Sequence, residues 1–263
     1  MQNNISDWIG IRKGENLKTA VIAPLGQSPP VVTTFIHGIR EKIDDCLVLT
    51  TTNTDVKAGY ELIKLAMKLK YPSVHVHEVE LPFEDVNTTE DNLKFVSICS
   101  RIIKEERETH NCDRIFLNVA GGRKNMCISL SLLGQVMGVD GVFHIVNKDV
   151  EIINLQLERM RAEIEKIYLA KSDEDKMKIY QQYAEDFDRI LFPSPKEYEL
   201  IRIPTLPYPL DYLGRIVSKI FQDMDSLTLE EKTILERHGI LERVGNRFQL
   251  TDYGAKFLGV FRK

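Results

Sequence analysis

The sequence predicts an α/β protein with a Rossmann-like, doubly wound and mainly parallel sheet, followed by a small C-terminal winged helix-turn-helix domain. Short apolar runs rich in β-branched residues alternate along the chain with longer segments of helical periodicity. Such an alternation implies right-handed crossovers, which place helices on both faces of the sheet. The length of 263 residues accommodates one large domain and one small one.

Five segments have the length and composition of strands, and four others have the spacing of helices. The predicted strands are residues 19–23, 46–51, 73–79, 114–120 and 141–146. The predicted helices are residues 30–42, 55–70, 89–109 and 124–137. In the strand order 3-2-1-4-5, strands one and four are neighbours, and their helices lie on opposite faces. A crevice then opens at the carboxyl ends of these two strands.

Residues 150–191 are crowded with Glu, Lys, Arg and Gln, and they predict one or two long charged helices with a break near Ser172. A solvated helical hairpin is the favoured interpretation, because a charge-rich helix face is usually solvated; a lid or a dimerisation arm is the alternative. A strand candidate follows at residues 197–203. Three prolines then mark a connector: Pro204, Pro207 and Pro209.

The C-terminal part of the chain has the order helix, helix, wing, helix that is typical of a winged helix-turn-helix. The predicted helices are residues 213–224, 229–238 and 251–261, with two short strands within 240–250. Thr228 and Glu231 have the spacing of a capping box in front of the second helix. The predicted domains are a polar lead-in at 1–18, the large domain at 19–209 and the winged helix at 210–263.

The composition excludes several classes of protein. The net charge is −4, so no global positive field attracts nucleic acid, and binding of a polyanion requires a local cluster of cations. The four cysteines form no C-x-x-C pair, so they predict no metal site. No apolar run approaches the length of a membrane span, and the N-terminus lacks an apolar signal core. We expect a soluble cytoplasmic protein without a cofactor or a metal.

The first loop of interest, residues 25–30 (LGQSPP), directly follows the first predicted strand. Gly26 permits a tight turn and a close approach of the backbone to a ligand. Ser28 is a good helix N-cap, and a proline after it suits the first helical turn. A helix N-terminus has free N–H groups and binds anions. The alternative is that Ser28 only caps its helix.

The second loop of interest, residues 121–125 (GGRKN), has the same layout after the fourth predicted strand. Gly121 and Gly122 leave the backbone bare, while Arg123 and Lys124 bring two positive charges to the start of a helix. Cations at that end oppose the helix dipole, and a bound phosphate explains their position. The alternative is that both side chains extend into water.

The crevice between strands one and four contains both loops in this prediction. Residues 51–54 (TTNT) follow the second strand beside them, and Thr52 and Asn53 are candidates for binding a ribose or a base. A helix cap at Thr54 is an equally good interpretation of this stretch.

Other ligand-binding motifs are absent from the sequence. There is no G-x-G-x-x-G after the first strand, no G-x-x-x-x-G-K-S/T and no G-x-S-x-G. His75 and His77 share one face of a predicted strand and could bind a metal, but the sequence places no acidic or cysteine partner beside them. We therefore interpret them as surface or packed histidines.

The two loops resemble those of the CARF domain, the sensor of cyclic oligoadenylate in type III CRISPR defence. The similar parts are Leu-Gly-Gln-Ser-Pro at 25–29 and Gly-Gly-Arg-Lys at 121–124, together with the connector at 202–208. The resemblance covers about residues 19–209, and a winged helix is a common partner of such domains. It implies a homodimer that presents both loops twice around a twofold symmetric ring.

The resemblance also implies which activities to expect. Many CARF proteins carry a HEPN ribonuclease domain with a closely spaced Arg and His. This chain has no convincing match, since Arg107 and His110 are too close and Arg237 and His238 are adjacent. A ring nuclease that cleaves cyclic tetra-adenylate in its own pocket is then the implied function. The alternative is a transcription regulator that binds the ring and DNA without cleavage.

DNA is the weaker of the predicted partners. The predicted recognition helix at 229–238 is nearly neutral, and the wing adds only Arg243 and Arg247, whereas phosphate contacts dominate affinity for DNA. The winged helix could instead only complete the dimer. A third possibility is an ordinary enzyme that binds a nucleotide or a sugar phosphate in the same crevice.

Ring nucleases of this kind use a Ser in the first loop and a Lys in the second, which implies Ser28 and Lys124 as catalytic residues. A ribose 2′-OH attacks the adjacent phosphorus in line, without a metal, and forms a 2′,3′-cyclic phosphate. Lys124 would stabilise charge on the phosphoryl oxygens, and Ser28 would orient the hydroxyl or bind a phosphate oxygen. No general base is visible at the loops, so we expect slow turnover. The predicted ring-binding residues are Gly26, Gln27, Pro29, Thr52, Asn53, Gly121, Gly122, Arg123 and Asn125.

Overall fold

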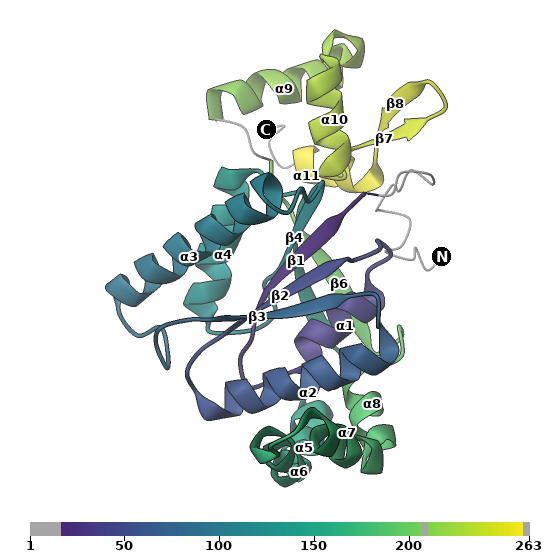
Figure 1. The fold of residues 1–263 in the computed structure, drawn as a ribbon. Helices are drawn as coiled ribbons and strands as arrows, with labels where there is room; N and C mark the ends of the chain where they lie inside the picture. Colours follow the sequence, from purple (N-terminus) through teal and green to yellow (C-terminus); the bar gives the residue numbers. More distant parts are fainter. Residues whose placement is uncertain (1–16, 207–209, 260–263) are drawn as a thin grey trace.

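The computed structural model describes residues 17–206 and 210–259, and its centre is a sheet of the order β3-β2-β1-β4-β5-β6 (Figure 1). Neighbouring strands pair in parallel except β5 and β6, which pair antiparallel. The strands are β1 (Thr19–Pro24), β2 (Asp45–Thr50), β3 (His75–Glu80), β4 (Arg114–Asn118), β5 (Gly141–Asn147) and β6 (Tyr198–Ile203). The predicted Rossmann-like fold, mainly parallel and with β1 beside β4, is confirmed.

Four helices cover the two faces of this sheet, which explains why its central strands are apolar on both sides. Along β1, Val21 belongs to the core beneath α1 (Pro30–Gly38) and α2 (Thr54–Lys70). The next residue, Ile22, belongs to the core beneath α3 (Thr89–Glu108) and α4 (Lys124–Met137). Figure 1 shows the two helix pairs on opposite sides of the sheet.

The charged segment folds differently from the prediction of one or two long solvated helices. It forms four short helices: α5 (Val150–Arg159), α6 (Arg161–Leu169), α7 (Asp173–Gln182) and α8 (Ala184–Leu191). The predicted break is confirmed, because Ser172 caps the N-terminus of α7. Three of the helices pack on α2, and Ile167, Tyr180 and Phe187 are fully or almost fully buried in the core beneath it. The segment is therefore amphipathic, with one face in the core and a charged face in solvent.

The C-terminal module consists of α9 (Leu210–Gln222), a 3₁₀ turn η2 (Met224–Ser226), α10 (Leu229–Arg237), the hairpin β7 (Leu241–Val244)–β8 (Arg247–Leu250) and α11 (Asp252–Gly259). The predicted capping box of Thr228 and Glu231 is confirmed. The assignment of the module to the winged-helix class stays a prediction, as do the domain boundaries. The predicted lead-in up to residue 16, the connector at 207–209 and the predicted helix end at 261 lie outside the described residues.

The module packs against the amino-terminal edge of the sheet. Arg202 in β6 donates hydrogen bonds to the carbonyls of Asp140, just before β5, and Arg237, at the end of α10. The buried side chains of Thr205 and His238 form a hydrogen bond of 3.1 Å. Figure 1 shows the module at the top and α5–α8 at the bottom of the view, at opposite ends of the molecule. In the part of the chain that the structure describes, no helix is long and apolar enough to cross a bilayer.

Candidate functional site

The loops that follow β1 and β4 touch each other through their backbones. A Cβ atom added to Gly26 would lie 3.1 Å from the backbone nitrogen of Gly122. A Cβ atom added to Gly121 would lie 2.2 Å from the carbonyl oxygen of Pro24, which is far inside the contact distance of the two atoms. Glycine is therefore required where the loops cross, and the crossing places both loops at the carboxyl edge of the sheet.

Ser28 does not cap α1, so this part of the sequence prediction is wrong. The N-cap is Pro29, which has helical backbone angles (φ −52°, ψ −36°) and offers no side-chain hydrogen bond. Ser28 precedes the cap by one residue, and its carbonyl, not its hydroxyl, accepts from Val31 at 3.4 Å. Among the described residues the Ser28 hydroxyl has no hydrogen-bond partner, so it is available to a ligand.

Lys124 is the first residue of α4 and is exposed to solvent. The N-cap before it, Arg123, forms no side-chain capping bond, and the side-chain oxygen of Asn125 accepts from the N–H of Met126 at 3.0 Å. Among the described residues, the N–H groups of Lys124 and Asn125 remain without a partner. No acidic side chain of residues 17–206 or 210–259 pairs with Lys124. An unneutralised ammonium at the positive end of a helix dipole attracts anions and weakens the helix in their absence.

Arg123 and Asn125, in contrast, are engaged by the loop that follows β3. The guanidinium of Arg123 donates to both carboxylate oxygens of Asp85, at 2.8 Å to Oδ1. This hydrogen bonding lowers the pKa of Asp85, which keeps the pair charged. The amide of Asn125 donates to the carbonyl of Val86 at 3.0 Å. A phosphate therefore has to compete with Asp85 for Arg123, and the side chains do not extend freely into water.

Thr52 and Asn53 have different roles in the structure. Asn53 is the N-cap of α2, where its side-chain oxygen accepts from the N–H groups of Asp55 (3.0 Å) and Val56 (3.3 Å). The predicted cap at Thr54 is therefore wrong by one residue, because Thr54 already belongs to the helix. The side chain of Thr52 is exposed, and its backbone N–H donates to the carbonyl of Phe83 at 3.0 Å.

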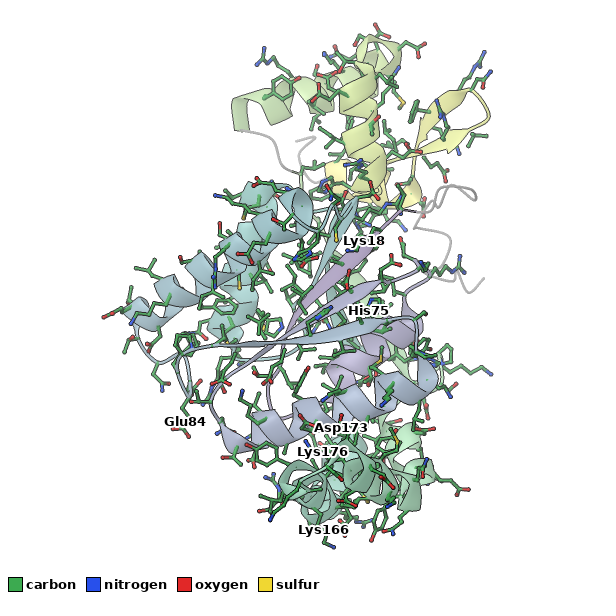
Figure 2. All side chains as sticks on the ribbon, viewed as in Figure 1. Lys18, His75, Glu84, Lys166, Asp173 and Lys176 are labelled. Carbon is green, nitrogen blue, oxygen red and sulfur yellow. The ribbon has the colours of Figure 1, made fainter. Side chains whose placement is uncertain are left out.

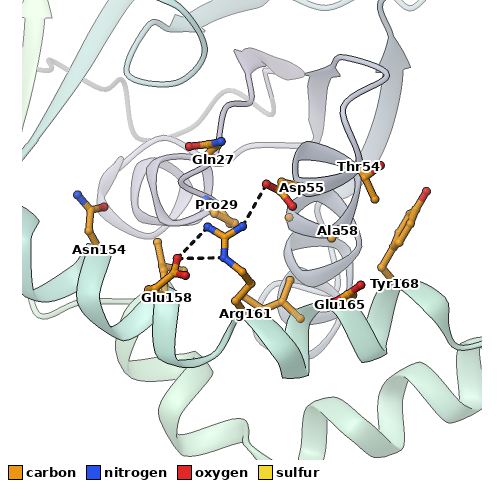
Figure 3. Close-up of a pocket in the computed structure, with 13 residues that line it drawn as sticks. Gln27, Pro29, Thr54, Asp55, Ala58, Asn154, Glu158, Arg161, Glu165 and Tyr168 are labelled. Atoms are coloured by element: carbon orange, nitrogen blue, oxygen red, sulfur yellow. Dashed lines mark hydrogen bonds and ion pairs between the residues drawn. The ribbon is translucent and has the colours of Figure 1, made fainter. Parts of the chain in front are cut away.

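A cavity of about 350 Å³ lies between the first loop, the start of α2 and the pair α5–α6 (Figure 3). Gln27 and Pro29 line it from the loop, and Tyr168 lines it from α6. Arg161 crosses it and forms ion pairs with Asp55 (3.1 Å) and Glu158 (2.8 Å). The residues from α5 and α6 were missed by sequence reasoning, because a charge-rich helix gives no signal of which neighbour it will meet.

The side chains that could hold a metal ion lie elsewhere. Among the described residues, Asp45, Glu106 and Cys112 bring their ligand atoms within 4.8 Å of one another, at the amino edge of the sheet. The candidate site at the carboxyl edge consists instead of backbone N–H groups, one hydroxyl and one ammonium. Such groups can bind phosphate oxygens and stabilise charge that develops on them.

A doubly wound sheet with paired glycine turns and a helix N-terminus at its carboxyl edge defines the class of Rossmann-like α/β proteins, in which this edge is the usual place for a ligand. More specifically, the model of the family "CRISPR-associated protein NE0113" matches residues 28–237. The chain belongs to this family. The match includes both Ser28 and Lys124, and it confirms the predicted relation to CRISPR-associated proteins.

Individual relatives share part of the chain. The CRISPR system ring nuclease SSO2081 of Saccharolobus solfataricus is 29% identical over 136 residues, which are 49% of this chain and 72% of that protein. Enterococcus italicus Csm6 bound to cyclic hexa-2′-fluoro-hexa-dAMP has 11% identity and a TM-score of 0.47, over 84% of this chain and 50% of that one. Can2 from Sulfobacillus thermosulfidooxidans in complex with cyclic tetra-adenylate has 13% identity and a TM-score of 0.39, over 92% and 64%. The chain thus spans half to two thirds of these solved structures.

Proposed function

We propose that this protein is a ring nuclease that binds cyclic tetra-adenylate at the carboxyl edge of its sheet and opens the ring. The observation that carries the proposal is the backbone contact between Gly26 and Gly122, because it brings the loops of Ser28 and Lys124 to one place. The relative named a ring nuclease supports the choice of activity.

A homodimer is part of this proposal, and an apolar stripe on α4 supports it. Ile128, Leu132 and Val136 recur at every fourth position, which puts them on one helix face, and they are 62%, 63% and 83% exposed. Val146 in β5 and Ile201 in β6 add apolar surface on the same face of the sheet, at 42% and 41% exposure. Monomeric proteins rarely expose a patch of this kind, and a second copy of the chain would cover it.

The position of this stripe relates the dimer to the ring. Lys124 opens the same helix that carries the stripe, so a twofold axis beside α4 would bring the Lys124 residues of two copies toward each other. A cyclic tetranucleotide has twofold symmetry and one negative charge per phosphate. Two copies would therefore present matching cations and glycine turns to opposite halves of the ring.

The proposed reaction is an internal transesterification. The 2′-oxygen of one ribose bonds to the adjacent phosphorus, the bond from phosphorus to the 5′-oxygen of the next nucleotide breaks, and that oxygen takes up the proton released by the hydroxyl. The products are linear, with a 2′,3′-cyclic phosphate at one end and a 5′-hydroxyl at the other. Lys124 and the open N–H groups of α4 would stabilise the phosphoryl oxygens, and Ser28 would orient the attacking hydroxyl.

The test uses purified full-length protein and labelled cyclic tetra-adenylate in excess EDTA, with enzyme in molar excess over ring. We expect conversion to linear products with a 2′,3′-cyclic phosphate end, at a slow rate because the loops contribute no general base. A ring that stays intact while it remains bound would refute cleavage and leave the sensing regulator as the function. A gel shift with DNA, with and without ring, then tests that alternative.

A further inference from the structure

We propose that the cavity beside the first loop binds an adenine base of the ring, and that this base stacks on the guanidinium of Arg161. This adenine site rests on the proposed ring nuclease function and names the residues that select the base. Gln27 and Pro29, which both line the cavity, flank Ser28 in the sequence. Because a base is bonded directly to its ribose, a ribose held at Ser28 places its base within reach of the cavity. The volume of about 350 Å³ falls within the range of small-molecule sites, about 300–1,000 Å³.

Arg161 crosses the cavity with its hydrogen-bonding edge already occupied (Figure 3). Its Nε and Nη2 atoms donate to one oxygen of the Glu158 carboxylate, at 3.0 and 2.8 Å. Its Nη1 atom donates to Asp55 at 3.1 Å. The two carboxylates therefore fix the plane of the guanidinium and offset its charge, and no aromatic ring of the described residues stacks on it. A planar guanidinium held in this way offers its face to a base.

The charges around the cavity favour a base over a phosphate. The lining includes a third carboxylate, Glu165, and among the lining residues in the described part of the chain Arg161 is the only cation. Figure 2 shows Lys166 at the outer rim of α6, pointing away from the sheet, so this lysine adds no charge to the cavity. The carboxylates would repel a phosphate, whereas a neutral base can stack on the paired guanidinium. The phosphates of the ring would instead lie toward Lys124.

Two side-chain amides can supply the contacts that distinguish adenine from other purines. Gln27 lines the cavity from the first loop and Asn154 lines it from α5, and neither amide has a hydrogen-bond partner among the described residues. A carboxamide donates one hydrogen bond and accepts another, which matches the N7 acceptor and the N6 amino group of adenine. Hypoxanthine presents acceptors at both N7 and O6. The carboxamide oxygen would then face another oxygen, and one of the two hydrogen bonds would be lost.

The test measures the binding of two rings to the full-length protein by calorimetry. Both rings consist of four 2′-fluoro nucleotides, one with adenine and one with hypoxanthine as the base. They lack the attacking hydroxyl, so binding is measured without cleavage. We expect the wild-type protein to bind the adenine ring about tenfold or more tightly than the hypoxanthine ring. Gln27→Leu and Asn154→Leu should each reduce this preference, and the double variant should abolish it.

Arg161→Lys tests the stacking surface separately from the amides. Lysine keeps the positive charge but has no planar group, so the affinity for both rings should fall by about fivefold or more, because stacking tolerates any base. The preference for adenine should remain. Unchanged affinity for both rings in Arg161→Lys would overturn the stacking role.

Lys176→Met is the matched control for Arg161→Lys. Lys176, labelled in Figure 2, pairs with Glu61 at 2.7 Å and so helps to anchor α7 on α2, but it does not line the cavity. We expect this variant to bind both rings like the wild type. If its ring affinity falls as much as that of Arg161→Lys, Arg161 acts only by anchoring the segment, and the stacking role is overturned. Circular dichroism melts check that each variant is folded.

The two rings also separate the adenine site from the function on which it rests. A wild-type protein that binds neither ring would refute ring binding itself, and the adenine site with it. A wild-type protein that binds both rings equally would leave ring binding intact and overturn only the selection of adenine by this cavity.

Discussion

Lys124 has its charge at the end of α4 where a cation destabilises the helix. The helix dipole places partial positive charge there, and an unfavourable charge at a helix end costs about 0.3–1 kcal/mol. No acidic partner among the described residues offsets this cost. A residue that weakens its own helix in this way is expected to act on something else, which we propose is a phosphate of the ring.

The first prediction separates the proposed effect of Lys124 on ring cleavage from its effect on the stability of α4. Lys124→Met should slow ring cleavage by about 10²–10³-fold, because it removes a group that stabilises developing charge. The same substitution should leave the free energy of unfolding unchanged or raise it by a few tenths of a kcal/mol. Single-turnover cleavage and urea denaturation measure the two effects. Lys171→Met, at an exposed lysine before α7, is the control, and equal cleavage rates in both variants would contradict the role of Lys124.

Gly121 shows how closely the two loops depend on each other. A Cβ atom there would lie 2.2 Å from the Pro24 carbonyl oxygen, which belongs to the backbone, so no flexible side chain can move aside to make room. Gly121→Ala should lower the free energy of unfolding by about 1–3 kcal/mol, as overpacked sites do, and should weaken ring binding. Urea midpoints and ligand titration measure these changes.

Gly214→Ala in α9 is the control for this substitution. A Cβ atom at Gly214 has nothing within 4 Å, and alanine is the better helix former, so stability should hold or increase. If both variants bind the ring equally and are equally stable, the loops are not locked together in the way the structure indicates.

At the scale of single elements, α4 combines two surfaces. Its inner face, with Met126 and Leu130, completes the core on one side of the sheet. Its outer face carries the exposed stripe of Ile128, Leu132 and Val136. A helix that is apolar on both faces is expected to be buried on both, and only a partner can bury the outer one.

The element-scale prediction is that Leu132→Glu produces a monomer. Glutamate is a good helix former and Leu132 is exposed, so the fold should persist while the charge blocks the contact between copies. Light scattering at micromolar concentration measures the mass, and ring cleavage should fall together with dimerisation. Leu229→Glu alters an equally exposed leucine on α10 and should change neither. A wild-type chain that is monomeric yet fully active would contradict the dimer model.

The segment α5–α8 closes one side of the first loop. Its buried residues anchor it on α2, and Arg161 links it to Asp55 at the start of that helix. The cavity in Figure 3 therefore has one wall from the sheet domain and one from this segment. Because α5–α8 are packed into the core, we interpret them as a fixed boundary of the cavity and not as a solvated hairpin.

At the scale of the whole molecule, His238 connects pH to the docking of the C-terminal module. Burial lowers the pKa of His238 to about 4, and the positive charge of Arg202 acts in the same direction. Its imidazole forms a hydrogen bond with the hydroxyl of Thr205, which lies in the segment directly after β6. The folded protein keeps this histidine neutral at pH values where the unfolded chain binds a proton.

The predicted consequence is a loss of stability in mild acid. Above pH 6.5 both states are neutral at this position, so it contributes nothing. Between pH 6.5 and about 4 only the unfolded chain gains a proton, so the free energy of unfolding should fall as pH falls, by on the order of 3 kcal/mol in total. Urea titrations at pH 7.5 and pH 5 should show a smaller difference in His238→Asn than in the wild type. An equal difference in both would show that His238 does not cause the loss.

The sequence by itself determined the alternation of strands and helices, and with it the position of β1 next to β4 in the sheet. These follow from local periodicity and from the handedness of crossovers. It also determined the capping box at Thr228, the break at Ser172 and the position of Lys124 at a helix start, since each depends on residues only a few positions apart.

Only the tertiary structure decided which distant groups meet. Asp85 reaches Arg123 across 38 positions of sequence, and Asp45 reaches His77 across 32. The first contact pairs a cation that the sequence predicted to be free for a phosphate, and the second gives His77 an acidic partner that the sequence did not place. The same holds for α5–α8, whose charge pattern was visible but whose place on α2 was not. Contacts of this range depend on how whole elements cross, which no local pattern encodes.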